Sequence, residues 1–194
     1  MNFLIDGPND AEHTLVLAHG AGGAMDTTFL NVVARGVGER RIRVVRFEFP
    51  YMAARRTGGK RGAPDRQPVL LQTWRDVVAE LGGPSLVIGG KSMGGRMATM
   101  IADELRVRGV VVLGYPFHPP GRPEKLRTAH LETMQTPTLI VQGTRDPFGT
   151  AEEVAAYRIS PAIRIEWLPG QHSLAGAQLA KAIERTANFV IALT

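Results

Sequence analysis

The sequence predicts an open, mostly parallel α/β sheet of about six to seven strands with helices on both faces. Three observations support this fold class. Several short runs, such as 14–18 and 110–113, are purely or almost purely apolar, as expected of strands buried on both faces. These runs alternate with segments of helical periodicity, which is the order expected of a parallel sheet with crossover helices. Glycine, proline or polar residues follow nearly every run, so each predicted strand ends in a loop.

The first half of the chain is predicted to contain three strands, the first of them a short edge strand, and two helices. Asp26 or Thr27 would cap the first helix, because short polar side chains accept hydrogen bonds from the free amides at a helix start. The second helix has a clear amphipathic pattern and ends at Gly82-Gly83-Pro84. A basic loop, residues 50–67, precedes it. We expect the strands at 3–5, 14–18 and 42–47 and the helices at 28–37 and 70–81.

The second half repeats the alternation of strand and helix. A buried strand at 86–88 leads through a tight turn into a helix that runs to about residue 107. The last strand alternates apolar and polar residues, which is typical of a sheet edge. We expect the remaining strands at 110–113, 138–141 and 163–168 and the remaining helices at 124–133, 150–157 and 174–192.

Length and composition indicate one ordinary globular domain over residues 1–194. The chain is 44% hydrophobic and 21% charged. It has no cysteine, which excludes disulfides and a cysteine nucleophile and favours an intracellular, cytoplasmic protein. The first residues lack the basic and apolar regions of a signal peptide, and no apolar run is long enough to span a membrane.

The positive charge is concentrated in one loop. The net charge is +5, and the segment 51–67 holds most of it. A nucleic-acid-binding protein would more often carry a basic face along a helix or sheet, so we expect no nucleic-acid partner. Because the loop follows a strand end, it could attract an anionic substrate, or it could be an ordinary solvated loop. Its charged residues are Arg55, Arg56, Lys60, Arg61 and Arg66 against Asp65.

One motif sits between the buried strand and its helix. Gly90-Lys91-Ser92-Met93-Gly94 fits the pattern G-x-S-x-G, with Ser92 at the apex of a sharp turn. The glycines are needed because side chains two residues from the serine would collide with neighbouring backbone. The turn exposes the serine hydroxyl and directs the first free amides of the helix toward an oxyanion beside it. Ser92 is therefore the candidate nucleophile.

Two further strand ends supply the partners that a serine nucleophile needs. In the order Ser, Asp, His, Asp146 follows the strand at 138–141 and His172 follows the last strand. His172 can take the proton of Ser92, and Asp146 can orient the imidazole. The amides of Ala21, in the glycine-rich segment 19–23, and of Met93 are the predicted oxyanion hole. Asp146 could instead only start the turn at Pro147, and His172 could only cap the last helix.

These motifs together resemble a known family. The chain is similar to small, lidless α/β hydrolases of the dienelactone-hydrolase-like group, and more closely to the NSL-complex-subunit-3-like hydrolases. The resemblance implies a Ser-Asp-His hydrolase core without a cap domain, and it says little about substrate. Dienelactone hydrolases themselves use cysteine where this chain has Ser92. The matching segments are 19–23, 58–61, 90–95, 114–121, 143–147 and 170–173.

The sequence thus predicts a serine hydrolase, a carboxylesterase or related acyl hydrolase, that needs no metal or organic cofactor. Its partner would be a small acyl substrate, and the oligomeric state stays open. Possible substrate contacts are His118, Tyr115, Phe117 and Arg61, although the first three could also form a packed turn. The alternative function is a catalytically silent binding or scaffold module with the same fold. Among the other histidines, we expect His19 to hold the glycine loop, and His13 and His130 to lie on the surface.

Overall fold

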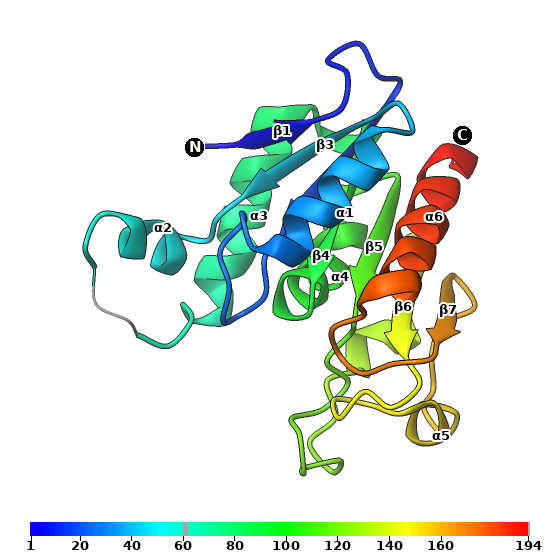
Figure 1. The fold of residues 1–194 in the computed structure, drawn as a ribbon. Coiled ribbons are helices and arrows are strands. Elements are labelled where there is room, and N and C mark those ends of the chain that lie inside the picture. Colours follow the sequence, from blue (N-terminus) through cyan, green and yellow to red (C-terminus); the bar gives the residue numbers. More distant parts are fainter. Residues whose placement is uncertain (60–61, 194) are drawn as a thin grey trace.

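A computed structural model describes residues 1–59 and 62–193 and contains one seven-stranded sheet (Figure 1). The strand order is β1-β3-β2-β4-β5-β6-β7, and only β1 runs antiparallel to its neighbour. The predicted fold class is confirmed, including the edge position of the last strand. The strands are β1 (Leu4–Asp6), β2 (His13–Ala18), β3 (Ile42–Phe47), β4 (Val87–Lys91), β5 (Gly109–Leu113), β6 (Thr138–Gly143) and β7 (Ile163–Leu168).

The central strands are apolar because both faces of the sheet are covered. Leu15 and Leu17 of β2 pack into one hydrophobic cluster, and Val16 and Ala18 pack into another on the opposite face. All four side chains are fully buried. A one-residue shift in register would move each of them to the opposite cluster, so the register of β2 with its neighbours decides which side chains fill each cluster.

Two pairs of helices form the outer layers (Figure 1). α1 and α6 lie in front of the sheet in this view, and α3 and α4 lie behind it. Thr27 caps α1 by accepting a hydrogen bond from the amide of Leu30 at 3.4 Å. Each helix buries one apolar stripe, as its sequence periodicity predicts. The long helices are α1 (Thr28–Gly38), α3 (Gln67–Leu81), α4 (Met93–Leu105) and α6 (Gly176–Ala192).

The structure corrects the prediction for the segment 50–67. A short helix, α2 (Pro50–Arg56), begins where a loop was expected, and α3 begins at Gln67 rather than at residue 70. Proline occupies the first turn of both helices, where its missing N–H costs no hydrogen bond. Proline was thus a start signal here rather than a sign of a loop.

Two predicted helices are much shorter than expected. In 124–133 the structure has only a 3-10 turn, η2 (Ala129–Glu132), and in 150–157 it has α5 (Ala151–Val154). Pro123 and the exposed polar residues after it leave the first segment no apolar stripe to bury. A second 3-10 turn, η1 (Gly83–Ser85), precedes β4. No cap covers the sheet within residues 1–59 and 62–193, as predicted.

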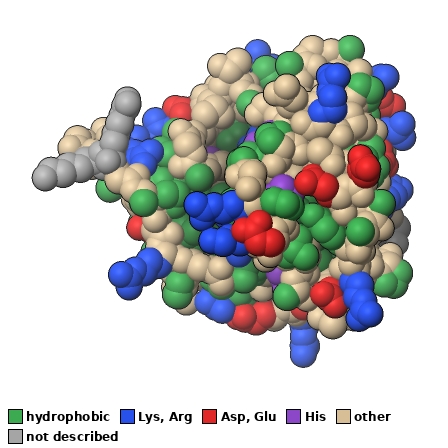
Figure 2. All heavy atoms as spheres, turned by 90° about the horizontal axis from the view of Figure 1, so that it is seen from below, with side chains coloured by type: hydrophobic (Ala, Val, Ile, Leu, Met, Phe, Trp, Pro, Cys, Tyr) green, Lys and Arg blue, Asp and Glu red, His purple; other side chains and the backbone are tan. Residues whose placement is uncertain are grey.

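The parallel strands end at one edge of the sheet, which points downward for β6 and β7 in Figure 1. Figure 2 views the molecule from below and shows this side hollowed, with basic side chains among hydrophobic ones near its middle. In such sheets, ligands bind beyond the carboxyl ends of the strands. Among the described helices, none combines the length and apolar character that a membrane crossing requires.

Candidate active site

Ser92 lies at the sharp turn between β4 and α4. Its backbone has φ 50° and ψ −116°, a strained conformation for a residue with a side chain. A Cβ on Gly90 would lie 2.2 Å from the carbonyl oxygen of Ala18, and one on Gly94 would lie 2.5 Å from that of His19. Both glycines are therefore required by close backbone approach, as the G-x-S-x-G pattern predicts. The turn places Ser92 at the start of α4.

His19 holds the glycine-rich segment beside this turn. Its Nε2 accepts a hydrogen bond from the amide of Phe49 at 3.1 Å, so its Nδ1 carries the proton and donates to the carbonyl of Gly20 at 2.7 Å. The ring is fully buried, and burial lowers the pKa of His19, which keeps the imidazole neutral. These contacts confirm the predicted structural role. Tyr51 adds a hydrogen bond from its hydroxyl to the carbonyl of Ala21 at 2.9 Å.

Asp146 and His172 lie together, although 26 residues separate them. His172 Nδ1 donates to Asp146 Oδ2 at 2.7 Å, and the carboxylate is completely buried. The other carboxylate oxygen accepts the amide of Phe148 at 2.9 Å. Asp146 therefore starts the turn, as one interpretation of the sequence held, and also orients the histidine. The loops after β6 and β7 bring the two residues to the same sheet edge.

Gln142 completes the environment of Asp146 and was missed by sequence reasoning. Its side-chain amide donates to Asp146 Oδ2 at 2.8 Å, and its Oε1 accepts the amide of Tyr115 at 2.6 Å. The residue is fully buried at the end of β6. A signal was present in the sequence, since a polar residue at the end of an otherwise apolar strand needs hydrogen-bond partners when buried.

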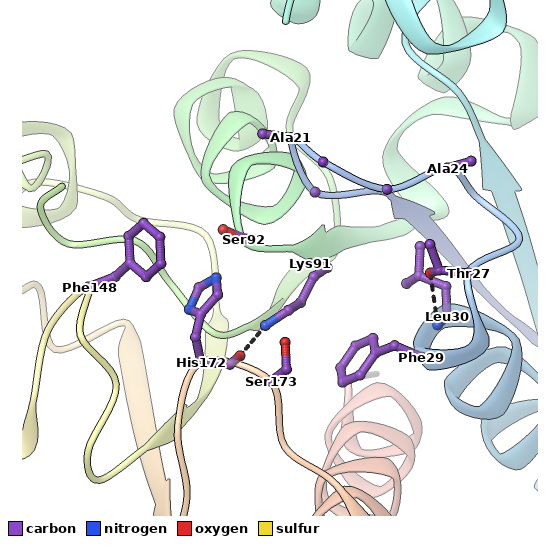
Figure 3. A pocket seen from close by; sticks show the side chains of 13 residues that line it. Ala21, Ala24, Thr27, Phe29, Leu30, Lys91, Ser92, Phe148, His172 and Ser173 are labelled. Atoms are coloured by element: carbon purple, nitrogen blue, oxygen red, sulfur yellow. Dashed lines mark hydrogen bonds between the residues drawn. The ribbon is translucent and has the colours of Figure 1, made fainter. Parts of the chain in front are cut away.

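Ser92 and His172 line one cavity of about 350 Å³. In Figure 3 the His172 ring lies between Phe148 and Lys91, with its edge toward Ser92. The centroids of the Phe148 and His172 rings are 4.3 Å apart, so packing helps to fix the imidazole plane. Among the described contacts, the Ser92 hydroxyl makes no hydrogen bond to His172. Catalytic hydrogen bonds are often long without substrate and tighten when it binds.

Lys91 is a second site residue that the motif alone did not single out, because it fills a variable position. Its ammonium group donates to the carbonyl oxygen of His172 and lies 5.2 Å from the centre of the Phe29 ring (Figure 3). Burial lowers the pKa of Lys91 to about 8. The side chain therefore ties the strand that carries Ser92 to the loop that carries His172.

Three of the expected substrate contacts are packed inside the protein. Tyr115 and Phe117 are fully buried, and their rings contact each other with centroids 4.7 Å apart. His118 is 2% exposed, and its Nδ1 is hydrogen-bonded to the carbonyl of Pro119 at 2.9 Å. None of the three lines the cavity beside Ser92, because the segment 114–118 turns inward after β5. The structure therefore contradicts substrate contact by these three residues and agrees with the packed turn, the other interpretation of the sequence. Arg61 lies outside the described residues.

His130 also differs from the prediction, because it is half-buried rather than on the surface. Its Nε2 is 2.9 Å from the hydroxyl of Thr99, which itself donates to the carbonyl of Arg96. Burial, reinforced by the charge of Arg96, lowers the pKa of His130 to about 4. The histidine thus links η2 to α4 in its neutral form.

The basic segment after β3 is partly neutralised by acids. Arg56 donates to both oxygens of Glu48 at 2.7 Å and forms an ion pair with Asp26 at 2.8 Å. The hydrogen bond from Arg56 to the Asp26 carboxylate lowers the pKa of Asp26. Arg55 lies 5.1 Å from the centre of the Tyr51 ring and donates to the carbonyl of Gly62. These contacts reduce the charge available to attract an anion from a distance.

The fold is similar to that of several solved structures. A serine hydrolase homologue from Coxiella burnetii has a TM-score of 0.75 at 21% identity, with 96% of this chain and 89% of that chain covered. Est1E from Butyrivibrio proteoclasticus has a TM-score of 0.73 at 15% sequence identity, with 97% of this chain and 92% of that chain covered. A serine hydrolase without a lid from Xanthomonas campestris has a TM-score of 0.69 at 20% sequence identity, with 97% of this chain and 85% of that chain covered. At these identities the similarity shows the fold alone.

The sequence itself carries the family relationship. Residues 11–192 match the profile of a family described as alpha/beta hydrolase domain, which covers nearly the whole chain and includes Ser92, Asp146 and His172. The same span contains the six strands β2 to β7, and β1 precedes it. The sheet order and the turn at Ser92 agree with this match. The chain therefore belongs to the alpha/beta hydrolase domain family and is a hydrolase.

Proposed function

We propose that the protein is a serine carboxylesterase or related acyl hydrolase that acts through Ser92, His172 and Asp146. The observation that carries this proposal is the 2.7 Å hydrogen bond between His172 and a fully buried Asp146, beside a strained serine in the same cavity. A serine hydroxyl is a poor nucleophile by itself and needs an adjacent base. The buried carboxylate orients that base and stabilises the imidazolium that forms when it takes a proton.

The reaction would proceed through an acyl-enzyme. Ser92 Oγ attacks the carbonyl carbon of the ester while His172 Nε2 takes the hydroxyl proton. The tetrahedral intermediate collapses, the bond to the alcohol breaks, and His172 returns the proton to the departing oxygen. Water then attacks the acyl group with His172 again as base, and Ser92 regains its proton. One ester and one water give one acid and one alcohol.

The oxyanion of each tetrahedral intermediate would bind to two backbone amides. Met93 is the first residue of α4, where amides lack helical partners. The segment that carries Ala21 packs on the turn, since a Cβ added to Gly20 would lie 3.7 Å from the Cβ of Ser92. Oxyanion-hole donors are typically worth about 3–4 kcal/mol each in the transition state. His19 supports this function indirectly by holding the Gly20 carbonyl.

The alternative, a binding module without catalysis, keeps the same fold but has no need for the hydrogen-bonded Asp146 and His172. A fluorophosphonate probe, which reacts with activated serines, separates the two functions. We expect the wild-type protein to be labelled and the Ser92→Ala and His172→Ala variants to lose labelling. Ester hydrolysis by either variant should fall by about 10³-fold or more.

The control is Ser173→Ala, which removes the other serine of the same cavity and should keep the labelling. Loss of labelling in this variant would show that the probe reacts at the wrong serine. A folded wild-type protein that is not labelled would contradict the esterase function and favour the binding module.

A further inference from the structure

A second cavity of about 390 Å³ meets the first one at Ser92. Ser92, Ala21 and Phe148 line both cavities, so the serine stands at their junction. His172 lines only the first cavity, and Met93 lines only the second. The proposed reaction gives the two cavities different tasks, because the base lines the first cavity and one oxyanion donor, Met93, lines the second.

The position of His172 decides which half of an ester enters which cavity. His172 must deliver a proton to the departing alcohol oxygen, so the alcohol lies on the histidine side. The carbonyl oxygen points to the amides of Ala21 and Met93. The remaining substituent of the carbonyl carbon, the acyl chain, then extends into the second cavity.

Two arginines line this second cavity. Arg96 lies one helical turn after Ser92, and its amide donates to the Ser92 carbonyl at 2.9 Å. Arg127 approaches from the segment before η2. The two charges are close enough that Arg96 is a cause of the lowered pKa of Arg127, after burial itself. Two cations held together beside a nucleophile repel each other unless an anion lies between them.

Neither arginine forms an ion pair within the described part of the chain. Arg96 has a buried Nε without a partner, and its Nη2 donates to the neutral side chain of Gln67 at 3.3 Å. One acid, Asp65, lines the same cavity, and its Oδ2 accepts the amide of Tyr51 at 2.9 Å. Asp65 therefore lies on the cavity wall, but among the described residues it forms no ion pair with either guanidinium group, so neither arginine is held by a carboxylate of this chain.

We propose that Arg96 and Arg127 bind a carboxylate at the far end of the acyl chain. The preferred substrates are then monoesters of dicarboxylic acids, which yield an alcohol and a dicarboxylate on hydrolysis. Guanidinium groups match carboxylates because their planar N–H donors form paired, charge-assisted hydrogen bonds. This inference rests on the proposed esterase function and adds its substrate class. It also assigns anion recognition to the cavity rather than to the basic segment 50–67.

Matched esters test the proposal. The 4-nitrophenyl monoesters of succinic, glutaric and adipic acid are compared with neutral 4-nitrophenyl esters of the same chain lengths. We expect kcat/KM to be about ten- to a hundredfold higher for the best monoester than for its neutral counterpart. In the Arg96→Gln and Arg127→Gln variants, the ratio of kcat/KM for the monoester to kcat/KM for the neutral ester should fall toward one. The exposed Arg66→Gln variant, in the basic segment, should keep the ratio of the wild type.

The neutral esters separate failure of the inference from failure of the proposed function. If the wild-type protein hydrolyses neutral esters but gives a ratio of one or below, the arginine site is overturned and the esterase function stands. If it hydrolyses neither class, the esterase function fails. If the ratio falls in Arg66→Gln and persists in the two cavity variants, the basic segment selects the anion, which also overturns the proposal. Residual turnover of neutral esters by each variant shows that the variant is folded.

Discussion

At the residue scale, Gln142 is a positioning residue that acts through Asp146. Its amide donor is one of three hydrogen-bond donors to the carboxylate, and it lies near the end of β6, four residues before Asp146. Removing a buried polar group that orients a functional side chain typically lowers activity by about ten- to a hundredfold. Gln142 also binds both backbone groups of Tyr115, so it ties the segment after β5 to the site.

Replacing Gln142 by Leu tests this role. We expect kcat on a neutral ester to fall by roughly ten- to a hundredfold with little change in KM, since substrate contacts stay intact. The unfolding free energy should drop by about 1–3 kcal/mol, because the buried amide of Tyr115 loses its partner. The exposed Gln135→Leu variant is the control. An unchanged kcat in the Gln142 variant would mean that Asp146 is held adequately by Phe148 alone.

Lys91 makes a prediction for the pH dependence of stability. Its pKa is about 8 in the folded protein and 10.5 when unfolded, so the unfolded chain binds more protons between these values. The wild-type protein therefore gains stability as pH rises through this window. Lys91→Met removes the titration, so its stability relative to wild type should be highest at pH 7.

The unfolding free energy of Lys91→Met minus that of the wild type should decrease by roughly 2 kcal/mol between pH 7 and pH 10. Urea unfolding of both proteins at the two pH values measures it. Other titrating groups cancel in the difference between wild type and variant. A difference that does not change with pH would show that the lysine is solvated like a surface residue.

At the element scale, the junction of β4 and α4 depends on space rather than on helix propensity. Gly94 lies in the first turn of α4, and a Cβ there would come within 2.8 Å of two atoms of Ala18 as well as close to His19. Alanine is normally favoured over glycine in a helix by about 1 kcal/mol. The backbone contact reverses that preference, because the atoms it meets cannot move away like a flexible side chain.

Gly94→Ala is therefore expected to lower the unfolding free energy by roughly 2–4 kcal/mol and to reduce probe labelling of Ser92. Gly22→Ala is the matched control, because nothing lies within 4 Å of the Cβ it would add. Thermal or urea unfolding of the two variants gives the comparison. A Gly94 variant as stable as the control would show that the glycine loop can move away from the turn.

The sequence predicted the elements best where one physical signal dominated. The buried strands at 14–18 and 110–113 are recognisable because water is excluded from both faces, so nearly every residue is apolar. Short helices such as α2 and α5 lack such a signal, since few residues cannot form an apolar stripe. α2 is held by tertiary contacts, for example the two ion pairs of Arg56. α5 begins at a local capping box between Thr150 and Glu153.

At the scale of the whole molecule, the candidate site could be predicted because its residues follow strand ends, which a parallel sheet brings to one edge. Ser92, Asp146 and His172 were found in this way. Gln142, Lys91 and the arginine pair were not, because their roles depend on which side chains meet across separate loops. The inward path of residues 114–118 agrees with the packed turn that was one of the two interpretations of the sequence, since aromatic residues after a strand fit a cavity wall or a core.

Acid stability should reflect His130, which joins η2 to α4. Its pKa is about 4 in the folded protein and 6.5 when unfolded, so the unfolded chain binds more protons within this window. Stability is therefore lost as pH falls from 6.5 toward 4.

Between pH 7 and pH 5, the unfolding free energy of the wild-type protein should fall by about 1 kcal/mol more than that of His130→Gln, after allowance for partial exposure of the ring. Glutamine can still donate to the hydroxyl of Thr99, so the link between the two elements is kept without a titrating group. Urea unfolding at both pH values measures the difference. Equal losses in the two proteins would mean that the ring is hydrated and that acid unfolding starts elsewhere, whereas the expected gap identifies the contact between η2 and α4 as an acid-sensitive one.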